Sequence, residues 1–167
     1  MGRQLSTSRV DLDVPVPVRD GAKLRANVVR PAGEGRHPVL LARLPYGKDL
    51  PLATLVLDPV QATRRGYAVV VQDTRGRFLS EGEFDPYRTE DVDGFDTIEW
   101  AAAQPWSGGR GGMYGAPYLG QTQWAAAKPQ PDALEEIPTY RTGHHPPQGP
   151  PRRGAAPEIA TPTPRGA

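Results

Sequence analysis

The segment from residue 115 to residue 120 carries the clearest signal for chemistry. It reads Gly115-Ala116-Pro117-Tyr118-Leu119-Gly120 and lies between an expected strand and an expected helix. A Gly-x-Ser-x-Gly turn in that setting presents a serine nucleophile for acyl transfer. Here Pro117 stands at the nucleophile position, with the next glycine three residues on. Because proline has no hydroxyl and its ring holds φ at about −65°, the segment predicts an acyl-transfer frame without a working nucleophile.

Other side chains offer little to replace that nucleophile. The serines are expected in turns or at caps, and His37 is expected to be exposed before a strand, so no Ser–His–acid set can be assembled. His144 and His145 could bind a metal weakly, but a solvated tail is the favoured interpretation. We therefore expect no cofactor and no metal. The serines are Ser6, Ser8, Ser80 and Ser107.

Three further patterns have both a functional and a structural interpretation. The run Gly108–Gly112 lacks the spacing of a phosphate-binding loop and should lead flexibly into a strand. Asp73 and Arg75 follow an expected strand and could be catalytic, but an ion pair that fixes their loop is favoured. A cluster of acidic residues could hold a cation, although complementing a helix dipole explains it more simply. The cluster is Glu90, Asp91, Asp93 and Asp96.

The elements that must position these residues begin with a hairpin. Val14, Val16 and Val18 alternate with prolines, which is typical of an edge strand because proline cannot donate to a central ladder. Asp20-Gly21 then favours a tight turn, since both residues tolerate positive φ. The hairpin is expected to pair residues 11–19 with residues 23–30.

After the hairpin, strands and helices alternate. Short, nearly continuous apolar runs are typical of parallel strands buried on both faces, and the segments between them have helical composition. Pro59 should kink its helix or split it into two short ones. This order predicts an α/β fold with a mainly parallel sheet of about five strands. The strands are expected at 38–42, 67–71 and 112–114, and the helices at 51–65, 90–103 and 118–128.

Composition limits the remaining possibilities. The 167 residues include 20 basic and 19 acidic side chains and no cysteine, which gives no reason to expect a nucleic-acid or membrane partner and excludes disulfides. With no apolar leader or spanning run, a soluble cytoplasmic protein is expected. We expect a folded domain over residues 11–128 and a disordered Pro/Arg/Gly-rich tail over residues 129–167. The 112–114 strand is expected to leave an open, aggregation-prone edge.

Several motifs, taken in order, resemble the N-terminal catalytic region of one family. They cover roughly Val14 to Lys128 and are similar to the cocaine-esterase and X-Pro dipeptidyl-peptidase family of α/β-hydrolases, serine enzymes that cleave acyl esters or dipeptides ending in proline. The motifs are Arg43-Leu44-Pro45-Tyr46-Gly47-Lys48, Gln72–Phe78, Ser80–Phe84, Asp93-Gly94-x-Asp96-Thr97-x-x-Trp100 and Gly112-Met113-Tyr114-Gly115.

The resemblance assigns roles to particular positions. In that family the turn reads Gly-x-Ser-Tyr-x-Gly, so Gly115, Tyr118 and Gly120 agree and Pro117 replaces the serine. It implies that Tyr118 supplies a backbone N–H, and Tyr46 a hydroxyl, to an oxyanion hole, and that the family's acid and histidine lie beyond this chain. We therefore expect an inactive serine hydrolase. The alternatives are a non-catalytic remnant that binds a small acyl ester or peptide, or a decayed gene product.

Overall fold

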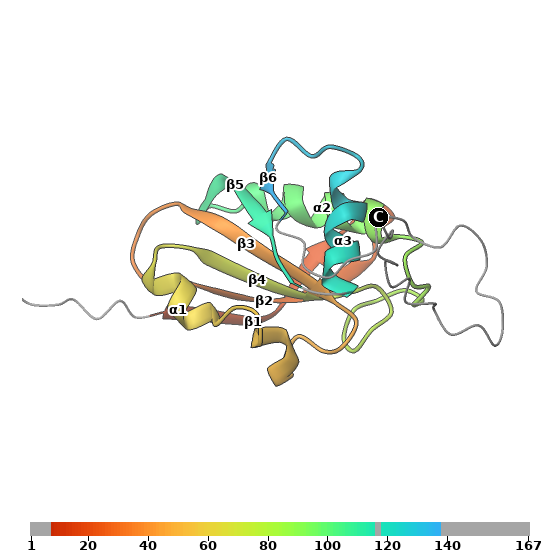
Figure 1. Cartoon of the computed structure of the whole chain (residues 1–167), viewed down its shortest axis with the longest axis horizontal. Helices are drawn as coiled ribbons and strands as arrows, with labels where there is room; N and C mark the ends of the chain where they lie inside the picture. The colour runs from red at the N-terminus through yellow and green to blue at the C-terminus, as the bar shows by residue number, and fades with distance from the viewer. Residues whose placement is uncertain (1–7, 116–117, 138–167) are drawn as a thin grey trace, which may run out of the picture.

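Six strands form one mixed sheet at the centre of the molecule (Figure 1). This computed structural model describes residues 8–115 and 118–137. The strand order is β1-β2-β4-β3-β5-β6, antiparallel from β1 to β4 and parallel from β4 to β6. The expected α/β class is confirmed, with six strands where about five were expected. The strands are β1 (Ser8–Pro17), β2 (Lys23–Pro31), β3 (His37–Leu44), β4 (Ala68–Asp73), β5 (Ser107–Met113) and β6 (Leu134–Glu136).

Helices cover both faces of this sheet. Successive side chains of β4 alternate between the two cores: Val70 packs in a cluster with Ile98, whereas Val69 and Val71 pack in a cluster with Ala62. All six residues of β4 are buried, as expected for a central strand. No helix within the described ranges is long and apolar enough to cross a bilayer. The helices are η1 (Pro51–Thr54), α1 (Pro59–Arg64), α2 (Glu90–Ala102) and α3 (Tyr118–Ala127).

Pro59 divides the first helical segment as the sequence indicates. Its ring suits the first position of α1, where no backbone donor is needed, and the Asp58 carboxylate caps the same end by accepting the Val60 N–H at 2.8 Å. Gly66 follows the helix with a φ of +89°, a conformation that glycine adopts without strain. Two short helices therefore replace one long helix over residues 51–65.

The N-terminal hairpin lies where it was expected. Pro15 and Pro17 occupy the outer strand β1, and Gly21 turns the chain with a φ of +90°. A bulge between Asp11 and Val14 shifts the register of β1 against β2 by one residue. Asp13 lies in this bulge with a φ of +52°, and its N–H donates to the side chain of Asn27 at 3.1 Å.

The structure differs from the expectation at β5 and β6. The glycine-rich run that should have been a flexible lead is part of β5, because parallel pairing with β3 outweighs its low strand propensity. A Cβ on Gly111 would lie 2.1 Å from the carbonyl oxygen of Val39, so only glycine fits this close approach. The edge expected to be open beside β5 carries β6, which falls in the expected tail. The rest of that tail, residues 138–167, lies outside the described residues.

We predict that Gly111→Ala destabilises the fold by about 1–3 kcal/mol, because its methyl group would overlap the backbone of β3. Gly108→Ala, in the same strand, is the control: its Cβ would meet its nearest atom, the His37 carbonyl oxygen, at 3.4 Å, an ordinary contact. Urea unfolding followed by circular dichroism measures both. Equal losses of stability in the two variants would contradict the close-approach argument.

Candidate active site

Three tyrosine rings meet where the parallel strands end. Tyr46 follows β3, Tyr87 precedes α2, and Tyr118 begins α3. The Tyr118 ring lies edge-on to Tyr46, with centroids 6.0 Å apart, and against Tyr87 at 5.0 Å. Tyr118 is 9% exposed, whereas Tyr46 and Tyr87 are each 39% exposed. The structure thus brings together the two tyrosines that the sequence singled out, and adds Tyr87, for which the sequence held no signal.

The turn before Tyr118 is framed by contacts on both sides. Gly115 has a φ of +123°, and a Cβ there would lie 2.3 Å from the Leu119 side chain, so this position requires glycine. The buried Gln123 amide donates to the Gly115 carbonyl oxygen at 3.0 Å. Pro117, the residue at the nucleophile position, lies outside the described residues, as does Ala116.

A buried ion pair fixes the Tyr118 side chain. The Tyr118 hydroxyl donates to one carboxylate oxygen of Glu90 at 3.0 Å, and the other oxygen lies 2.7 Å from the Arg43 guanidinium. The Arg43 side chain is completely buried and that of Glu90 is 5% exposed. Burial, together with the negative charge of Glu90, raises the pKa of Tyr118 well above its usual range. Tyr118 therefore stays neutral and remains a hydrogen-bond donor.

Arg43 extends this contact across the sheet. Its Nε donates to the Gln72 side chain at 2.8 Å, which ties β3 to β4. A second guanidinium nitrogen donates to the Glu90 carbonyl oxygen at 3.1 Å, at the start of α2. The Thr122 hydroxyl of α3 donates to the Arg43 carbonyl oxygen at 3.3 Å. One arginine therefore connects two strands with α2 and α3.

A second charged group holds the loop that carries Tyr46. The Lys48 N–H donates to the Asp73 carboxylate at 2.7 Å, and its buried ammonium lies 2.7 Å from Asp13 and 2.9 Å from Asp49. Burial disfavours the charged amine, but these carboxylates outweigh it and raise the pKa of Lys48. Burial raises the pKa of Asp73 as well, although Lys48 opposes that shift. The loop after β3 is thus tied to β4 and to the bulge of β1.

Arg77 adds a tie between the loops after β3 and β4. Its Nε donates to the Pro45 carbonyl oxygen at 2.9 Å, immediately before Tyr46. The guanidinium also lies 5.5 Å from the Phe78 ring centroid and 5.0 Å from that of Phe84, within the range of a cation–π contact. The position of Tyr46 therefore depends on both neighbouring loops.

The acidic residues at the start of α2 serve different partners. Besides Glu90, Asp93 pairs with Arg75 at 2.6 Å, and Asp96 pairs with Arg19 at 2.7 Å. Within the described part of the chain, no three His, Asp or Glu side chains are grouped so that they could hold a metal ion. The expected ion pair of Asp73 with Arg75 is therefore wrong, because Lys48 and Asp93 offer each of them a closer opposite charge.

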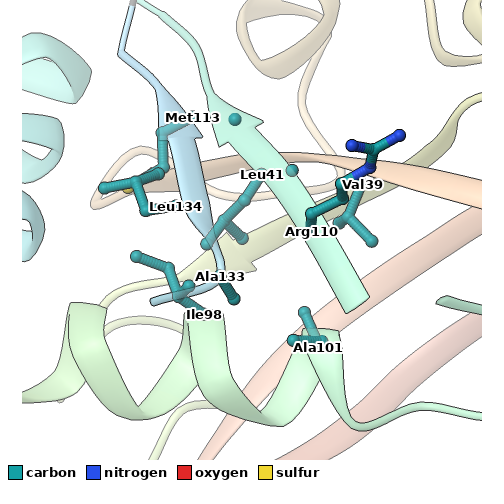
Figure 2. A pocket seen from close by; sticks show the side chains of 11 residues that line it. Val39, Leu41, Ile98, Ala101, Arg110, Met113, Ala133 and Leu134 are labelled. Atoms are coloured by element: carbon teal, nitrogen blue, oxygen red, sulfur yellow. The ribbon is translucent and has the colours of Figure 1, made fainter. Parts of the chain in front are cut away.

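A small apolar cavity lies on the other side of β5, away from the tyrosines. Its volume is about 20 Å³, room for about one water molecule, and it opens between α2, β3, β5 and β6 (Figure 2). Leu41, Ile98, Met113 and Leu134 line it, as Figure 2 shows. Ala101 and Ala133 line it as well, and Arg110 is the one charged residue of the lining.

Comparison with known proteins establishes the family. Residues 20–144 of the 167 match the X-Pro dipeptidyl-peptidase (S15) family. The chain belongs to this family. Cocaine esterase from Rhodococcus sp. (strain MB1 Bresler) is 48% identical to this chain over 117 residues, which are 69% of this chain and 20% of the esterase.

Solved structures agree with this membership. A CocE/NonD family hydrolase from Staphylococcus aureus is 34% identical with a TM-score of 0.69, and the match covers 75% of this chain and 26% of that one. An α-amino acid ester hydrolase is 28% identical with a TM-score of 0.69, covering 81% of this chain and 25% of that one. This S15-family chain therefore spans about a quarter of the length of these relatives, or less.

Within the described residues of this S15-family chain, the serines and the histidine have structural roles. His37 begins β3, at the end of the sheet opposite the tyrosines and roughly 20 Å away along the strand, and its Nδ1 lies 3.1 Å from the Gly66 carbonyl oxygen. The Ser80 hydroxyl donates to the Asp73 carbonyl oxygen at 2.8 Å, and Ser107 accepts the Gly109 N–H at 3.1 Å. Ser8 bonds to the hydroxyl of Thr63. Ser6, His144 and His145 lie outside the described residues.

We predict that Glu90→Gln destabilises the fold by about 3–5 kcal/mol, because it leaves the buried Arg43 charge without its carboxylate. Asp91→Asn, one residue along the same helix, should change stability by less than about 1 kcal/mol, since Asp91 is only partly buried. Urea unfolding at neutral pH compares the two variants with the parent. A loss for Glu90→Gln no larger than that for Asp91→Asn would refute the role of the ion pair.

A pH-dependent contribution is expected from Asp96. Burial opposes its ionisation, but hydrogen bonds from Arg19 outweigh burial and hold the pKa of Asp96 below its ordinary value of 3.8. The pKa of Asp96 is thus lower in the folded chain than in the unfolded chain. Its ionised form therefore stabilises the fold fully above the unfolded pKa, and this stabilisation is lost as the pH falls through the folded pKa. Asp96→Asn should lower the thermal midpoint at pH 7, and the difference from the parent should shrink below about pH 4. A difference in thermal midpoint between the variant and the parent that stays constant down to pH 2 would contradict this contribution of Asp96.

Proposed function

We propose that this chain is a catalytically inactive member of the S15 family. The observation that carries the proposal is Pro117, which stands two residues after Gly115 and directly before Tyr118, where the family resemblance requires serine. In a serine hydrolase, the serine oxygen bonds to the substrate carbonyl carbon and the alcohol or amine is released. A proline ring supplies no such oxygen and no backbone N–H.

No described side chain stands in for the lost serine. The described serines hold turns and strands through hydrogen bonds, and His37 lies at the opposite end of the sheet. Tyr118 is a poor substitute, because its hydroxyl is buried, donates to Glu90 and has a raised pKa. Tyr46 is more exposed, but a tyrosine needs a base to become a nucleophile at neutral pH. These contacts support the absence of turnover.

A second candidate function, binding without catalysis, is supported by the tyrosine cluster. Tyr46 is held by the loops after β3 and β4, and its ring packs on the buried Tyr118. By the family resemblance the Tyr46 hydroxyl would donate to a carbonyl oxygen. The printed names of the relatives, cocaine esterase and α-amino acid ester hydrolase, point to small esters. We propose a small acyl ester or a short peptide as the ligand class.

Chemical labelling tests the loss of catalysis. The purified chain should hydrolyse p-nitrophenyl acetate no faster than its heat-denatured form and should not react covalently with a fluorophosphonate probe, since no activated serine is present. Intact-mass spectrometry reads the labelling, and Pro117→Ser provides the matched variant, which restores both the hydroxyl and the backbone N–H at this position. Labelling of the parent chain that heat denaturation abolishes would show that a nucleophile survives and would overturn the proposal.

Ligand-dependent stabilisation tests the binding function. Phenyl acetate should raise the thermal midpoint of the parent chain, and Tyr46→Phe should weaken that ligand about fivefold, the loss expected for one neutral hydrogen bond. Tyr67→Phe is the control, because Tyr67 is similarly exposed, at 37%, but directly precedes β4 at the other end of the sheet. No shift in the parent, or equal loss in both variants, would remove the binding function and leave a decayed gene product.

A further inference from the structure

The two edges of the sheet are protected to different degrees. β6 forms one edge and is only three residues long, with exposed Glu135 and Glu136. β1 forms the other edge, and Pro15 and Pro17 block its second half against further pairing. The first half of β1, residues 8–12, contains no proline and no lysine. This short stretch is the unguarded part of the edge.

The direction of the main-chain groups follows from the ladder. Lys23 and Arg25 direct their N–H groups away from β1, to Glu81 at 2.9 Å and Ser80 at 2.9 Å. Because strand residues alternate, the even-numbered residues of β2 face β1, among them Val28 and Arg30, which are opposite Asp11 and Arg9. The main-chain groups of Arg9 and Asp11 therefore bond to β2. The main-chain groups of Ser8, Val10 and Leu12, which lie between and beside these two residues, point outward.

The side chains of the outward residues make this stretch apolar. Val10 is 52% and Leu12 is 66% exposed, and both project from the face on which Ser8 contacts Thr63 of α1. Val60 of α1 adds a further exposed apolar side chain on that face, at 43%. On the opposite face Arg9 and Asp11 form an exposed ion pair at 3.0 Å. Among the described residues, none bonds to the outward backbone groups of this stretch, which also carries apolar side chains and one charge of each sign.

We propose that this edge binds a second copy of the same chain, with the two β1 strands pairing antiparallel about Val10. Val10 of each copy then exchanges backbone hydrogen bonds with Val10 of the other, and Ser8 with Leu12. Arg9 of each copy faces Asp11 of the other in a non-hydrogen-bonded pair, where side chains approach most closely. Val10 and Leu12 of both copies form one continuous apolar strip.

The charges of Arg9 and Asp11 favour this register over the alternative registers. The two copies of β1 can be shifted against each other only in steps of two residues. A shift by an odd number would place outward backbone groups of one copy opposite inward groups of the other. A two-fold axis at Asp11 would place Asp11 opposite Asp11, and an axis at Arg9 would place Arg9 opposite Arg9. Like charges directly opposite are destabilising, whereas the axis at Val10 gives an Arg–Asp pair on each side. A second copy therefore fits this edge better in one register than in the others.

Single cysteines test the register, because the chain contains no cysteine of its own. With the axis at Val10, the two Cα atoms at this position would be about 5.5 Å apart, within the range of a disulfide. Val10→Cys should therefore give a reducible covalent dimer under mild oxidation. Leu12→Cys is the control with similar exposure: its two copies would lie about 13 Å apart along the strand and should stay unlinked. Equal cross-linking at both positions would overturn the proposed pairing.

Charge exchange tests the contact independently of cysteine chemistry. Sedimentation of the intact parent chain should show a concentration-dependent dimer. Arg9→Glu and Asp11→Lys should each weaken self-association about tenfold or more, since both pairs become like-charged. Mixing the two variants should restore a mixed dimer, because each glutamate or aspartate then faces a lysine or arginine. A parent chain that is monomeric at the highest concentration, or variants that dimerise as the parent does, would overturn the proposal.

Discussion

The buried ion pair between Arg43 and Glu90 is the contact on which the site depends. Both side chains are almost fully removed from water, which is unfavourable by several kcal/mol per ion unless other groups compensate. The compensation comes from Gln72, from the Glu90 carbonyl group and from the Tyr118 hydroxyl. These partners belong to different strands and helices, so the pair is satisfied only when those elements are assembled. The position of Tyr118 follows from that requirement.

Helix α2 is anchored by the same kind of contact at three points along its length. Glu90, Asp93 and Asp96 meet Arg43, Arg75 and Arg19, which come from β3, from the loop after β4 and from the end of the hairpin. The spacing of three residues keeps the carboxylates on one side of the helix. Acidic residues at this end also suit the helix dipole, so the local explanation and the tertiary contacts agree. The helix is thereby oriented against every element that contributes a tyrosine.

Short-range sequence patterns predicted the elements that depend on residues close together in the chain. The hairpin, β3, β4 and the three helical segments follow from proline positions, apolar runs and caps within a few residues. Of β5 the sequence indicated only the end, with a strand expected at 112–114, and it did not indicate β6. The glycine-rich part of β5 forms a strand where a neighbour requires close approach, as Val39 does at Gly111. Of the site, the sequence indicated Tyr46 and Tyr118 through a family resemblance. The partners of Lys48, Glu90 and Asp73 come from distant segments, so no local pattern could have assigned them.

The described residues on either side of the turn, Gly115 and Tyr118, are held by contacts from other parts of the chain. Gly115 provides the positive φ, Gln123 binds its carbonyl group, and Glu90 binds the Tyr118 hydroxyl, each through atoms outside position 117. Each of these contacts is made by residues other than the one at position 117. The tyrosines are therefore held by buried ion pairs, hydrogen bonds and ring packing from several elements.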